Sequence, residues 1–424
     1  MVSRAAISCP STSGSSGGRN SSVHRGIQRT ILAQSTSSHG IGDTRTDSDR
    51  IVYSWCAGED SWDFDRKDEA PLALPKVAQG RVATVTLVRH GQSTWNARNR
   101  VQGSSDFSVL TEKGISQAQE SAQVLSQLLQ EQRDLSVYVS PLKRARQTAD
   151  IILQGYSEEV VDGMCVIPSL REIDLYSFQG MDKYSTRAAN SKEYAEWKSH
   201  PAEFEIDGHA PVRELWYRAS LAWQNILAAE SDHCLVVAHN AVNQALICTA
   251  LGLPPSMFRR IQQSNASFSQ LQFTHDDVRV QCINSFPVVS MMEKEITKSH
   301  YKLVLVCGGT NDSSSILSRI KDVDTMLPCM VAVGTPGEQV VDVMTALEAS
   351  LSSSAQSGIV AIADAEACDE IVRRCVSSDT DTVVMNQRRF DFRPGSATIL
   401  SFTSKDSCHA NLVCSNYTSQ RLLA

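Results

Sequence analysis

The stretch "VTLVRHGQSTWN", from Val85 to Asn96, decides how this sequence folds and where its chemistry lies. Apolar residues that favour strands run directly into Arg89 and His90, and Gly91 then opens a polar loop. An ordinary core strand would end in a turn without an arginine and a histidine at its tip. Because glycine lets the backbone turn sharply and approach an anion closely, this strand end is predicted to form a ligand site.

Strand and helix patterns alternate around this stretch, over residues 81–288. Short apolar runs predict strands over residues 81–90, 135–141, 233–239, 268–274 and 278–286, and apolar residues at helical spacing predict helices over 111–132, 141–153, 211–230 and 240–253. This alternation predicts an α/β fold, a three-layer sandwich with a mostly parallel central sheet. His90, Ser140 and His239 all lie at carboxyl ends of strands, where such sheets bind ligands.

Length and composition limit the classes of protein to consider. The 424 residues suffice for two domains, and 42% hydrophobic with 21% charged residues is ordinary for a soluble globular chain. The net charge of -7 speaks against a nucleic-acid partner, and no apolar run approaches the roughly 20 residues that cross a membrane. The 12 cysteines show no zinc-ligand spacing and no acidic cluster suggests a metal site, so no metal is expected, and no cofactor is predicted.

The N-terminal segment differs in composition from the rest of the chain. It is rich in Ser, Thr, Gly and Ala, contains several arginines, and has no acidic residue before Asp43. Residues 1–45 are therefore predicted to be a transit peptide for a chloroplast or mitochondrion, with a merely disordered terminus as the alternative. Residues 46–80 are acidic, proline-punctuated and aperiodic, which is typical of a linker.

The polar residues at the strand ends suit a phosphomonoester, whose transfer depends on cations placed around its oxygens. Arg89 and His90 follow one predicted strand, Arg144 follows the second and His239 follows the third, while Asn96 can donate from its amide. Taken singly, each has a structural explanation; Arg144, for example, suits a solvated cation at a helix start. Together they favour one phosphate site at one edge of the sheet.

Five segments resemble the motifs of the histidine phosphatase superfamily, the phosphoglycerate mutase-like fold, and occur in its order: "LVRHGQSTWN", "RVQGSSDFSVLTEKG", "YVSPLKRARQTA", "LREIDLYSFQG" and "VVAHNAV". The resemblance implies that His90 becomes transiently phosphorylated. It also implies that Glu172 protonates the leaving oxygen and then activates water, with Asp174 as a second candidate. The phosphate-binding residues that it implies are Arg89, Asn96, Arg144 and His239.

The resemblance also bears on substrate choice. The loop "NRVQGSSD" resembles that of phosphatase members rather than that of the glycolytic mutases. Tyr176 stands where many phosphatases have glycine and is expected to narrow the pocket. The insert from Met181 to Pro211 offers cations for a second anionic group, although many of them suit a solvated face: Lys183, Arg187, Lys192, Lys198, His200 and His209.

The expected partner is a small anionic phosphorylated sugar or sugar acid. The insert resembles chloroplast members of the superfamily that act on 2-carboxy-D-arabinitol 1-phosphate, an inhibitor of Rubisco, which places the expected enzyme in the chloroplast stroma. Two alternatives stay open: a broader sugar-phosphate or fructose-2,6-bisphosphatase-like phosphatase, and a pseudoenzyme that only binds a phosphorylated ligand. The sequence leaves the oligomeric state open.

Residues 300–424 resemble a shortened, degenerate repeat of the first domain. "LVLVCGGT" parallels "VTLVRHGQ", "VAVGTPGEQ" parallels "VYVSPLKRA", and "IVAIADAEACDEIVRRC" parallels "CLVVAHNAVNQALIC". On this register four residues replace the phosphate-site residues Arg89, His90, Arg144 and His239, in that order: Cys307, Gly308, Gln339 and Asp364. Because no nucleophile remains and an aspartate repels phosphate, this half is predicted to be non-catalytic.

Overall fold

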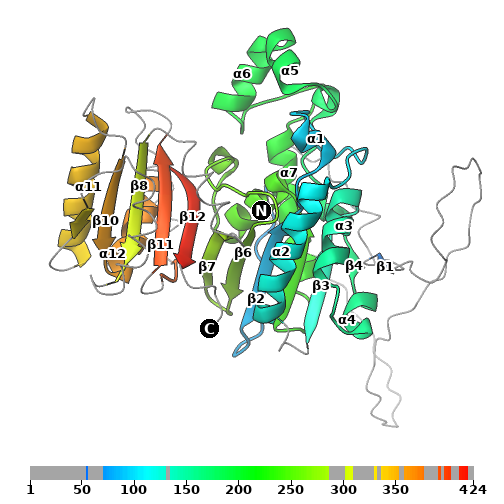
Figure 1. Ribbon diagram of the computed structural model, residues 1–424, viewed down its shortest axis with the longest axis horizontal. Helices are drawn as coiled ribbons and strands as arrows, with labels where there is room; N and C mark the ends of the chain where they lie inside the picture. The colour runs from blue at the N-terminus through cyan, green and yellow to red at the C-terminus, as the bar shows by residue number, and fades with distance from the viewer. Residues whose placement is uncertain are drawn as a thin grey trace, which may run out of the picture. The chain divides into compact units, whose positions relative to one another are not determined.

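The computed structural model describes residues 54–55, 70–129, 134–285, 301–308, 329–331, 336–352, 358–376, 390–392, 396–402 and 410–418 (Figure 1). The expected transit peptide over residues 1–45 lies outside the described residues. Within these ranges, no helix combines the length and the apolar character that crossing a membrane requires.

The strands next to the site run in the order β1-β4-β3-β5-β2-β6-β7. Their bounds are Ser54–Trp55 (β1), Ala83–Arg89 (β2), Leu135–Val139 (β3), Cys165–Val166 (β4), His233–Ala238 (β5), Phe268–Phe273 (β6) and Val278–Ser285 (β7). Strands β1 to β5 pair parallel, whereas β6 and β7 are antiparallel to their neighbours. The predicted α/β fold with a mostly parallel central sheet is confirmed.

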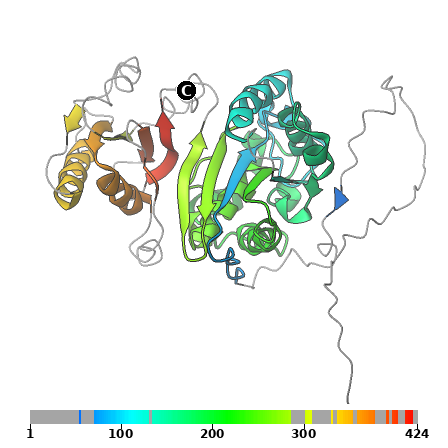
Figure 2. The same cartoon turned by 90° about the horizontal axis from the view of Figure 1, so that it is seen from below.

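Helices cover both faces of this sheet, as Figure 2 shows for α2 in cyan and α7 in green. Their bounds are Thr94–Ala97 (α1), Glu112–Leu129 (α2), Lys143–Ile152 (α3), Glu158–Asp162 (α4), Pro211–Ile226 (α7) and Asn240–Ala250 (α8). Because successive strand residues point to opposite faces, Val85 and Leu87 pack in one core with Trp223 of α7, while Val88 packs in another with Leu125 of α2.

The segment expected to be a linker, residues 46–80, contributes to the fold at two places. Strand β1 pairs parallel with β4 at one edge of the sheet. Further along, the side chain of Val77 is buried, and the backbone N–H of Leu72 donates to Ser220 Oγ of α7 at 2.8 Å. The packed domain therefore begins before residue 81.

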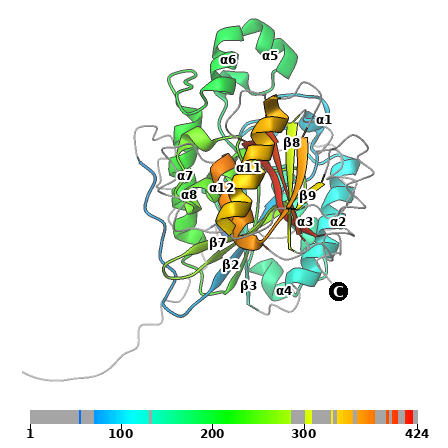
Figure 3. The same cartoon turned by 90° about the vertical axis from the view of Figure 1, so that its left-hand side faces the viewer.

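Two helices of the insert stand apart from the layers. Helices α5 (Lys183–Ala189) and α6 (Ser191–Ser199) lie beyond α1, at the end of the sheet where β2 leads into α1 (Figures 1 and 3). Asp182 caps α5 by accepting from the backbone N–H groups of Tyr184 and Ser185. The insert therefore stands over the edge of the sheet at which the predicted site residues emerge.

The sheet continues beyond β7 with β12-β11-β8-β10-β9. The elements of this part are Tyr301–Cys307 (β8), Cys329–Val331 (β9), Pro336–Ser352 (α11), Gly358–Ala363 (β10), Ala365–Val376 (α12), Ser396–Phe402 (β11) and Ala410–Thr418 (β12). Strand β8 pairs parallel with β10 and antiparallel with β11, as β2 pairs with β5 and β6.

The register at the end of β8 repeats that of β2. Cys307 lies opposite Ala363, as Arg89 lies opposite Ala238. The next backbone N–H, that of Gly308, donates to Ala363 O at 3.0 Å, and the N–H of His90 donates to Ala238 O at the same distance. These positions agree with the sequence register, while the repeat itself stays a prediction.

Candidate active site

His90 is the first residue after β2 and is 2% exposed. Its Nδ1 lies 2.7 Å from the carbonyl oxygen of Gly91. Because a carbonyl oxygen only accepts hydrogen bonds, Nδ1 carries the ring proton and Nε2 keeps its lone pair. The ring is thus fixed in the tautomer whose Nε2 can act as a nucleophile.

The loop after His90 is held by a close backbone crossing. A Cβ atom on Gly91 would lie 2.3 Å from the carbonyl oxygen of Gly114, and one on Gly114 would lie 2.0 Å from that of Gln92. No side chain fits at either position, so the two glycines allow the loop to rest on the start of α2. Asn265 donates from Nδ2 to the carbonyl oxygen of His90 at 3.0 Å.

Burial and two nearby arginines, Arg144 and Arg89, lower the pKa of His90 well below its ordinary value of 6.5. Burial disfavours the charged imidazolium, and each guanidinium adds repulsion. His90 is therefore neutral at physiological pH, as a nucleophile must be.

Arg144 lies in α3 and is fully buried. Its guanidinium donates to the carbonyl oxygens of Ser105 at 2.7 Å and Gly103 at 2.9 Å, which fixes its orientation. Burial lowers its pKa to about 10, against the opposing attraction of Glu172, so it stays charged at neutral pH. Arg144 is therefore not a solvated cation at a helix start.

Arg89 and Asn96 approach the site from the two ends of the loop. Arg89 donates from NH1 to the carbonyl oxygen of Gln263 at 2.6 Å. Asn96 accepts at Oδ1 from the backbone N–H of Ser93 at 3.2 Å and from Ser93 Oγ at 3.0 Å. Since its oxygen is occupied in this capping box of α1, its Nδ2 is the group that can donate to a ligand.

His239 follows β5 directly, is fully buried, and forms the N-cap of α8. Its Nε2 lies 2.6 Å from Ser140 Oγ, and its ring meets that of His90 edge-on at a centroid distance of 5.1 Å. Burial, followed by Arg144 and His90, lowers its pKa well below 6.5. Its buried Nδ1 has no hydrogen-bond partner within the described part of the chain, which suits a polar group supplied by a ligand.

Glu172 is 9% exposed and reaches the N-terminus of α8. Its Oε1 accepts from the backbone N–H groups of Ile173 at 3.0 Å, Ala241 at 3.1 Å and Val242 at 3.2 Å. The first turn of a helix offers such unpaired N–H groups to an anion. The turn that joins β5 to α8 therefore carries His239, and the first N–H groups of α8 bind the carboxylate of Glu172.

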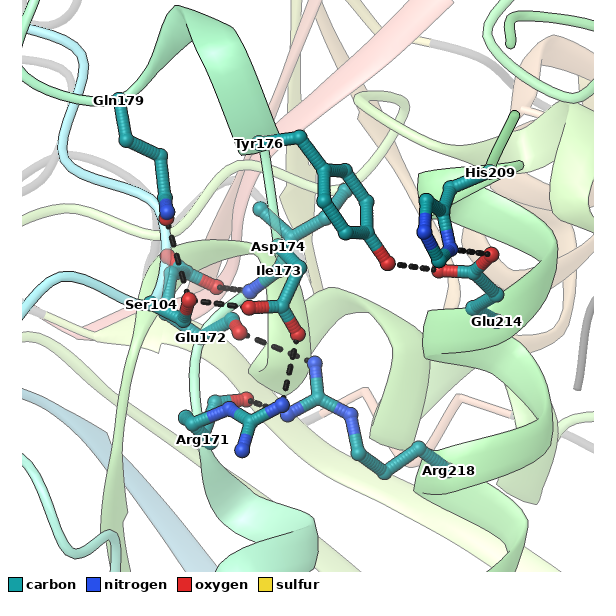
Figure 4. Close-up of polar contacts among 10 residues, drawn as sticks. All are labelled: Ser104, Arg171, Glu172, Ile173, Asp174, Tyr176, Gln179, His209, Glu214 and Arg218. Atoms are coloured by element: carbon teal, nitrogen blue, oxygen red, sulfur yellow. Dashed lines mark hydrogen bonds and ion pairs between the residues drawn. The ribbon is translucent and has the colours of Figure 1, made fainter. Parts of the chain in front are cut away.

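Asp174, the second candidate acid, belongs to an ion-pair network (Figure 4). It pairs with Arg171 at 2.8 Å and accepts from Ser104 Oγ. Burial alone would raise its pKa, but Arg218, Arg171 and these hydrogen bonds outweigh it and lower the pKa. Asp174 is thus ionised and held by its ion pair and hydrogen bonds, which does not suit a proton donor.

Arg218 of α7 is a supporting residue that sequence reasoning missed. Its guanidinium donates to the carbonyl oxygens of Arg171 at 2.8 Å and Glu172 at 2.9 Å, and it is 2% exposed (Figure 4). The sequence offers only a weak signal, an arginine one helical turn after Glu214 on a largely apolar helix. Arg218 thereby fixes the backbone from which Glu172 extends.

Tyr176 follows this segment with a φ of +42°, a conformation that favours glycine. Its hydroxyl donates to Glu214 Oε2 at 2.7 Å, and its ring stacks on His209 at a centroid distance of 4.0 Å (Figure 4). Glu214 is 4% exposed and also accepts from the backbone N–H of Ala210. These contacts hold the tyrosine in its unfavourable backbone conformation. That Tyr176 narrows the pocket stays a prediction.

The lowered pKa values predict how the two histidines titrate. His90 and His239 are expected to remain neutral at pH 6, where the unfolded chain already takes up protons near its pKa of 6.5. Folding stability should therefore decline as the pH falls below about 6.5. NMR of ring-labelled histidine checks the titration, and urea unfolding at pH 7.5 and 5.5 checks the stability. A His90 ring protonated above pH 6.5 would contradict the prediction.

These residues define a class: an α/β protein whose parallel strand ends gather two neutral histidines and two arginines, with a carboxylate on a helix N-terminus. Residues 85–285 match the model of the histidine phosphatase superfamily, branch 1, and the chain belongs to this superfamily. It is 34% identical over 194 residues to the probable phosphoglycerate mutase GpmB of Cronobacter sakazakii, covering 84% of that protein and 45% of this chain.

Two plant proteins are more similar. The chain is 44% identical over 261 residues to 2-carboxy-D-arabinitol-1-phosphatase of Triticum aestivum, which is 60% of this chain. It is 44% identical over 250 residues, or 57% of this chain, to the probable 2-carboxy-D-arabinitol-1-phosphatase of Arabidopsis thaliana. The chain spans about half the length of these relatives, 50% of each.

Proposed function

We propose that this chain is a phosphatase that hydrolyses a phosphomonoester through a phosphohistidine on His90. The observation that carries the proposal is the state of His90, which is neutral, with Nδ1 bound to the carbonyl oxygen of Gly91 and Nε2 left to react. Arg144 and Arg89 lie close enough to depress its pKa, so they can also stabilise the charge on a phosphoryl group.

In the first step, Nε2 of His90 attacks phosphorus in line with the leaving oxygen. A P–N bond forms, the P–O bond breaks, and protonated Glu172 gives its proton to the leaving alkoxide. His90 keeps its Nδ1 proton and becomes the phosphohistidine. The Nδ1–H···O=C contact with Gly91 favours the positive charge that the ring acquires.

In the second step, the Glu172 carboxylate takes a proton from water, whose oxygen attacks phosphorus from the side vacated by the alcohol. The P–N bond breaks, inorganic phosphate leaves, and neutral His90 and protonated Glu172 are regenerated. The electron pair of the P–N bond returns to Nε2. Arg144, held by two carbonyl oxygens, and the amide of Asn96 keep the phosphoryl oxygens in place through both steps.

The insert supports a substrate with a second anionic group. Lys183, Arg187 and Lys198 are exposed on α5 and α6. Partial desolvation and then Arg89 lower the pKa of Lys183. Partial desolvation and then Arg259, Lys183 and Arg187 lower the pKa of Lys198. Lys183, Arg187, Lys198 and Arg259 make no ion pair within the described ranges, so this cluster has positive charge to offer a ligand.

The other cations of the insert have different places. His209 stacks on Tyr176 and contacts Glu214, and His200 contacts Ser199 Oγ at 2.9 Å. Arg259, which lies outside the insert, takes part instead: its guanidinium lies 4.4 Å from the ring centroid of Trp197 and donates to the carbonyl oxygen of that residue. It therefore ties α6 to the segment that follows residue 258.

The substrate that we propose is a sugar acid phosphate, 2-carboxy-D-arabinitol 1-phosphate, the Rubisco inhibitor acted on by the chloroplast enzymes that the insert resembles. Its phosphate would occupy the site at His90 and its carboxylate the cations of the insert. The names of the plant relatives support this choice and a chloroplast location. A bisphosphate would satisfy the same two groups of cations, so the experiment must compare both substrates.

Replacing Lys198 by methionine is expected to raise KM for 2-carboxy-D-arabinitol 1-phosphate about tenfold, because one charge-assisted contact to the carboxylate is lost. For arabinitol 1-phosphate, which lacks the carboxylate, the rise should be several times smaller. Phosphate release over a range of substrate concentrations measures both. Lys192→Met, on the same helix, is the matched control.

Equal rises for the two esters would contradict the second anion site. Faster hydrolysis of fructose 2,6-bisphosphate than of the carboxylated ester would move the chain to the broader sugar-phosphate phosphatases. Release of phosphate from none of these esters, with bound ester retained, would favour a ligand-binding pseudoenzyme.

A further inference from the structure

One loop supports the catalytic residues from behind. We define the support loop as residues 259–267, between the short 3-10 helix η4 (Pro255–Met257) and β6. Its Gln263 carbonyl oxygen accepts from Arg89 NH1 at 2.6 Å, and its Asn265 side chain donates to His90 O at 3.0 Å. The backbone N–H of Ala266 also donates to Arg89 O at 3.1 Å. The position of Arg89 and His90 therefore depends on this loop.

The other side of the support loop is held by β12, which belongs to the non-catalytic half. The backbone N–H of Leu412 donates to Arg260 O at 2.7 Å, and the N–H of Gln262 donates to Leu412 O at 3.0 Å. Between these bonds, Ile261 and Leu412 form a parallel bridge, and both side chains are buried. Leu412 of β12 thus contacts three consecutive residues of the loop, 260 to 262, and Gln263 follows them directly.

A second contact has the same form with the two halves exchanged. Phe390, which precedes β11, bridges Val280 of β7, and the N–H of Asp391 donates to Val280 O at 2.9 Å. Strands β7 and β12 pair antiparallel between the two contacts, with Ser415 opposite Ile283. The segment that precedes β6 thus bridges β12 of the other half, and the segment that precedes β11 bridges β7. Two subunits related by a two-fold axis contact each other in the same reciprocal way.

The chemistry of the second half agrees with a supporting role. Gly308 stands at the strand end that corresponds to His90, so the half offers no imidazole there. A loop whose backbone N–H and C=O groups have no hydrogen-bond partners, such as those that β12 gives the support loop, tends to be mobile. Since a catalytic group displaced by about 1 Å can cost on the order of 10²-fold in rate, a fixed loop matters to the site.

We propose that residues 301–418 serve as an internal partner that positions Arg89 and His90 through the support loop. The inference rests on the proposed function for its kinetic readout, but phosphate binding tests it independently. Leu412 is a positioning residue in this scheme, because it acts only through the loop. The support loop also begins with Arg259, whose guanidinium donates to Trp197 O of α6. The position of the loop therefore also affects the cations of the insert.

The test replaces Leu412 by proline in the full chain, which removes the N–H donor to Arg260 O. Leu412→Ala is the matched control, because it keeps the backbone bridge and removes only side-chain packing. Calorimetry with inorganic phosphate is expected to show affinity about tenfold weaker for the proline variant than for the alanine variant. The kcat/KM, divided by the fraction of molecules that can form the phosphoenzyme, should fall about 10²-fold in the proline variant alone.

A readout that mere instability would not move is the titration of His90. Because Arg89 helps to lower the pKa of His90, a displaced Arg89 should let that pKa rise in Leu412→Pro but not in Leu412→Ala. If Leu412→Pro fails to fold, Gln262→Pro removes the other bond of the bridge from the loop side, with Gln262→Ala as its control.

Equal phosphate affinity and equal His90 titration in the proline and alanine variants would overturn the proposal. If the wild-type chain binds phosphate yet forms no phosphoenzyme, the proposed function fails, while the binding and titration data still decide whether the second half positions the site.

Discussion

Replacing His90 by asparagine is expected to lower turnover of any phosphomonoester by about 10⁴-fold or more, because the nucleophile is lost. Asparagine occupies a similar volume in the buried site but offers no basic ring nitrogen toward phosphorus. Arg144 and His239, the buried side chains that we propose to bind phosphate, remain, so binding of inorganic phosphate should persist. Rapid mixing with radiolabelled substrate, followed by quenching in base, measures the phosphoenzyme directly.

The label on wild-type protein is expected to be stable in base and labile in acid, as a phosphoramidate is, and absent from His90→Asn. His275→Asn is the matched control: this histidine contacts Val77 O at 3.0 Å, away from the site residues, and its loss should leave the label in place. A label that persists in His90→Asn would show that another residue is the nucleophile.

Glu172→Gln is expected to lower turnover of sugar phosphates by about 10²–10⁴-fold, because the leaving alkoxide receives no proton. Glutamine can keep the local structure, since all three backbone N–H groups contact Oε1, and only the second, longer contact of Ala241 goes to Oε2. An aryl phosphate, whose leaving group needs no proton, should still phosphorylate His90. The phosphoenzyme should then accumulate, because the base that activates water is also missing.

Asp174→Asn separates the acid role from the ion-pair role. It breaks the pair with Arg171 and weakens the hydrogen bond from Ser104, so the free energy of unfolding should fall by about 1–3 kcal/mol. Turnover per folded molecule should change less than tenfold. Steady-state kinetics with an alkyl and an aryl phosphate compare the two variants; a larger loss for Asp174→Asn, confined to the alkyl ester, would transfer the acid role to Asp174.

The two halves of the chain share a pattern of strand pairing but differ in the side chains at their strand ends. Strands β8, β10 and β11 pair with one another as β2, β5 and β6 do, and Gly308 makes the backbone hydrogen bond that His90 makes. Backbone pairing depends on apolar strand patterns, which both halves have. The proposed site depends on individual side chains, and at the corresponding strand end of the second half Gly308 stands in place of His90.

The sequence by itself determined the α/β class, the order of the longer strands and helices between residues 81 and 288, and the residues at the strand ends. Each of these follows from local pattern: apolar runs that stop at His90 and His239, helical spacing between them, and the fact that parallel strands present their carboxyl ends at one edge. The motifs added Glu172, which no periodicity identifies, and the structure places it on the N-terminus of α8.

Only the tertiary structure decided which contacts and charges surround each ionisable group. Sequence spacing did not distinguish Glu172 from Asp174 as the acid. The pKa of Asp174 is lowered by its neighbour Arg171 and by Arg218 of α7, and Arg218 lies near it only after folding. The support of Arg89 by the loop that β12 holds, and the place of Arg259 beside the insert, likewise join segments far apart in the chain. Such contacts carry no local signal, because burial and charge at one residue depend on side chains that folding brings from elsewhere.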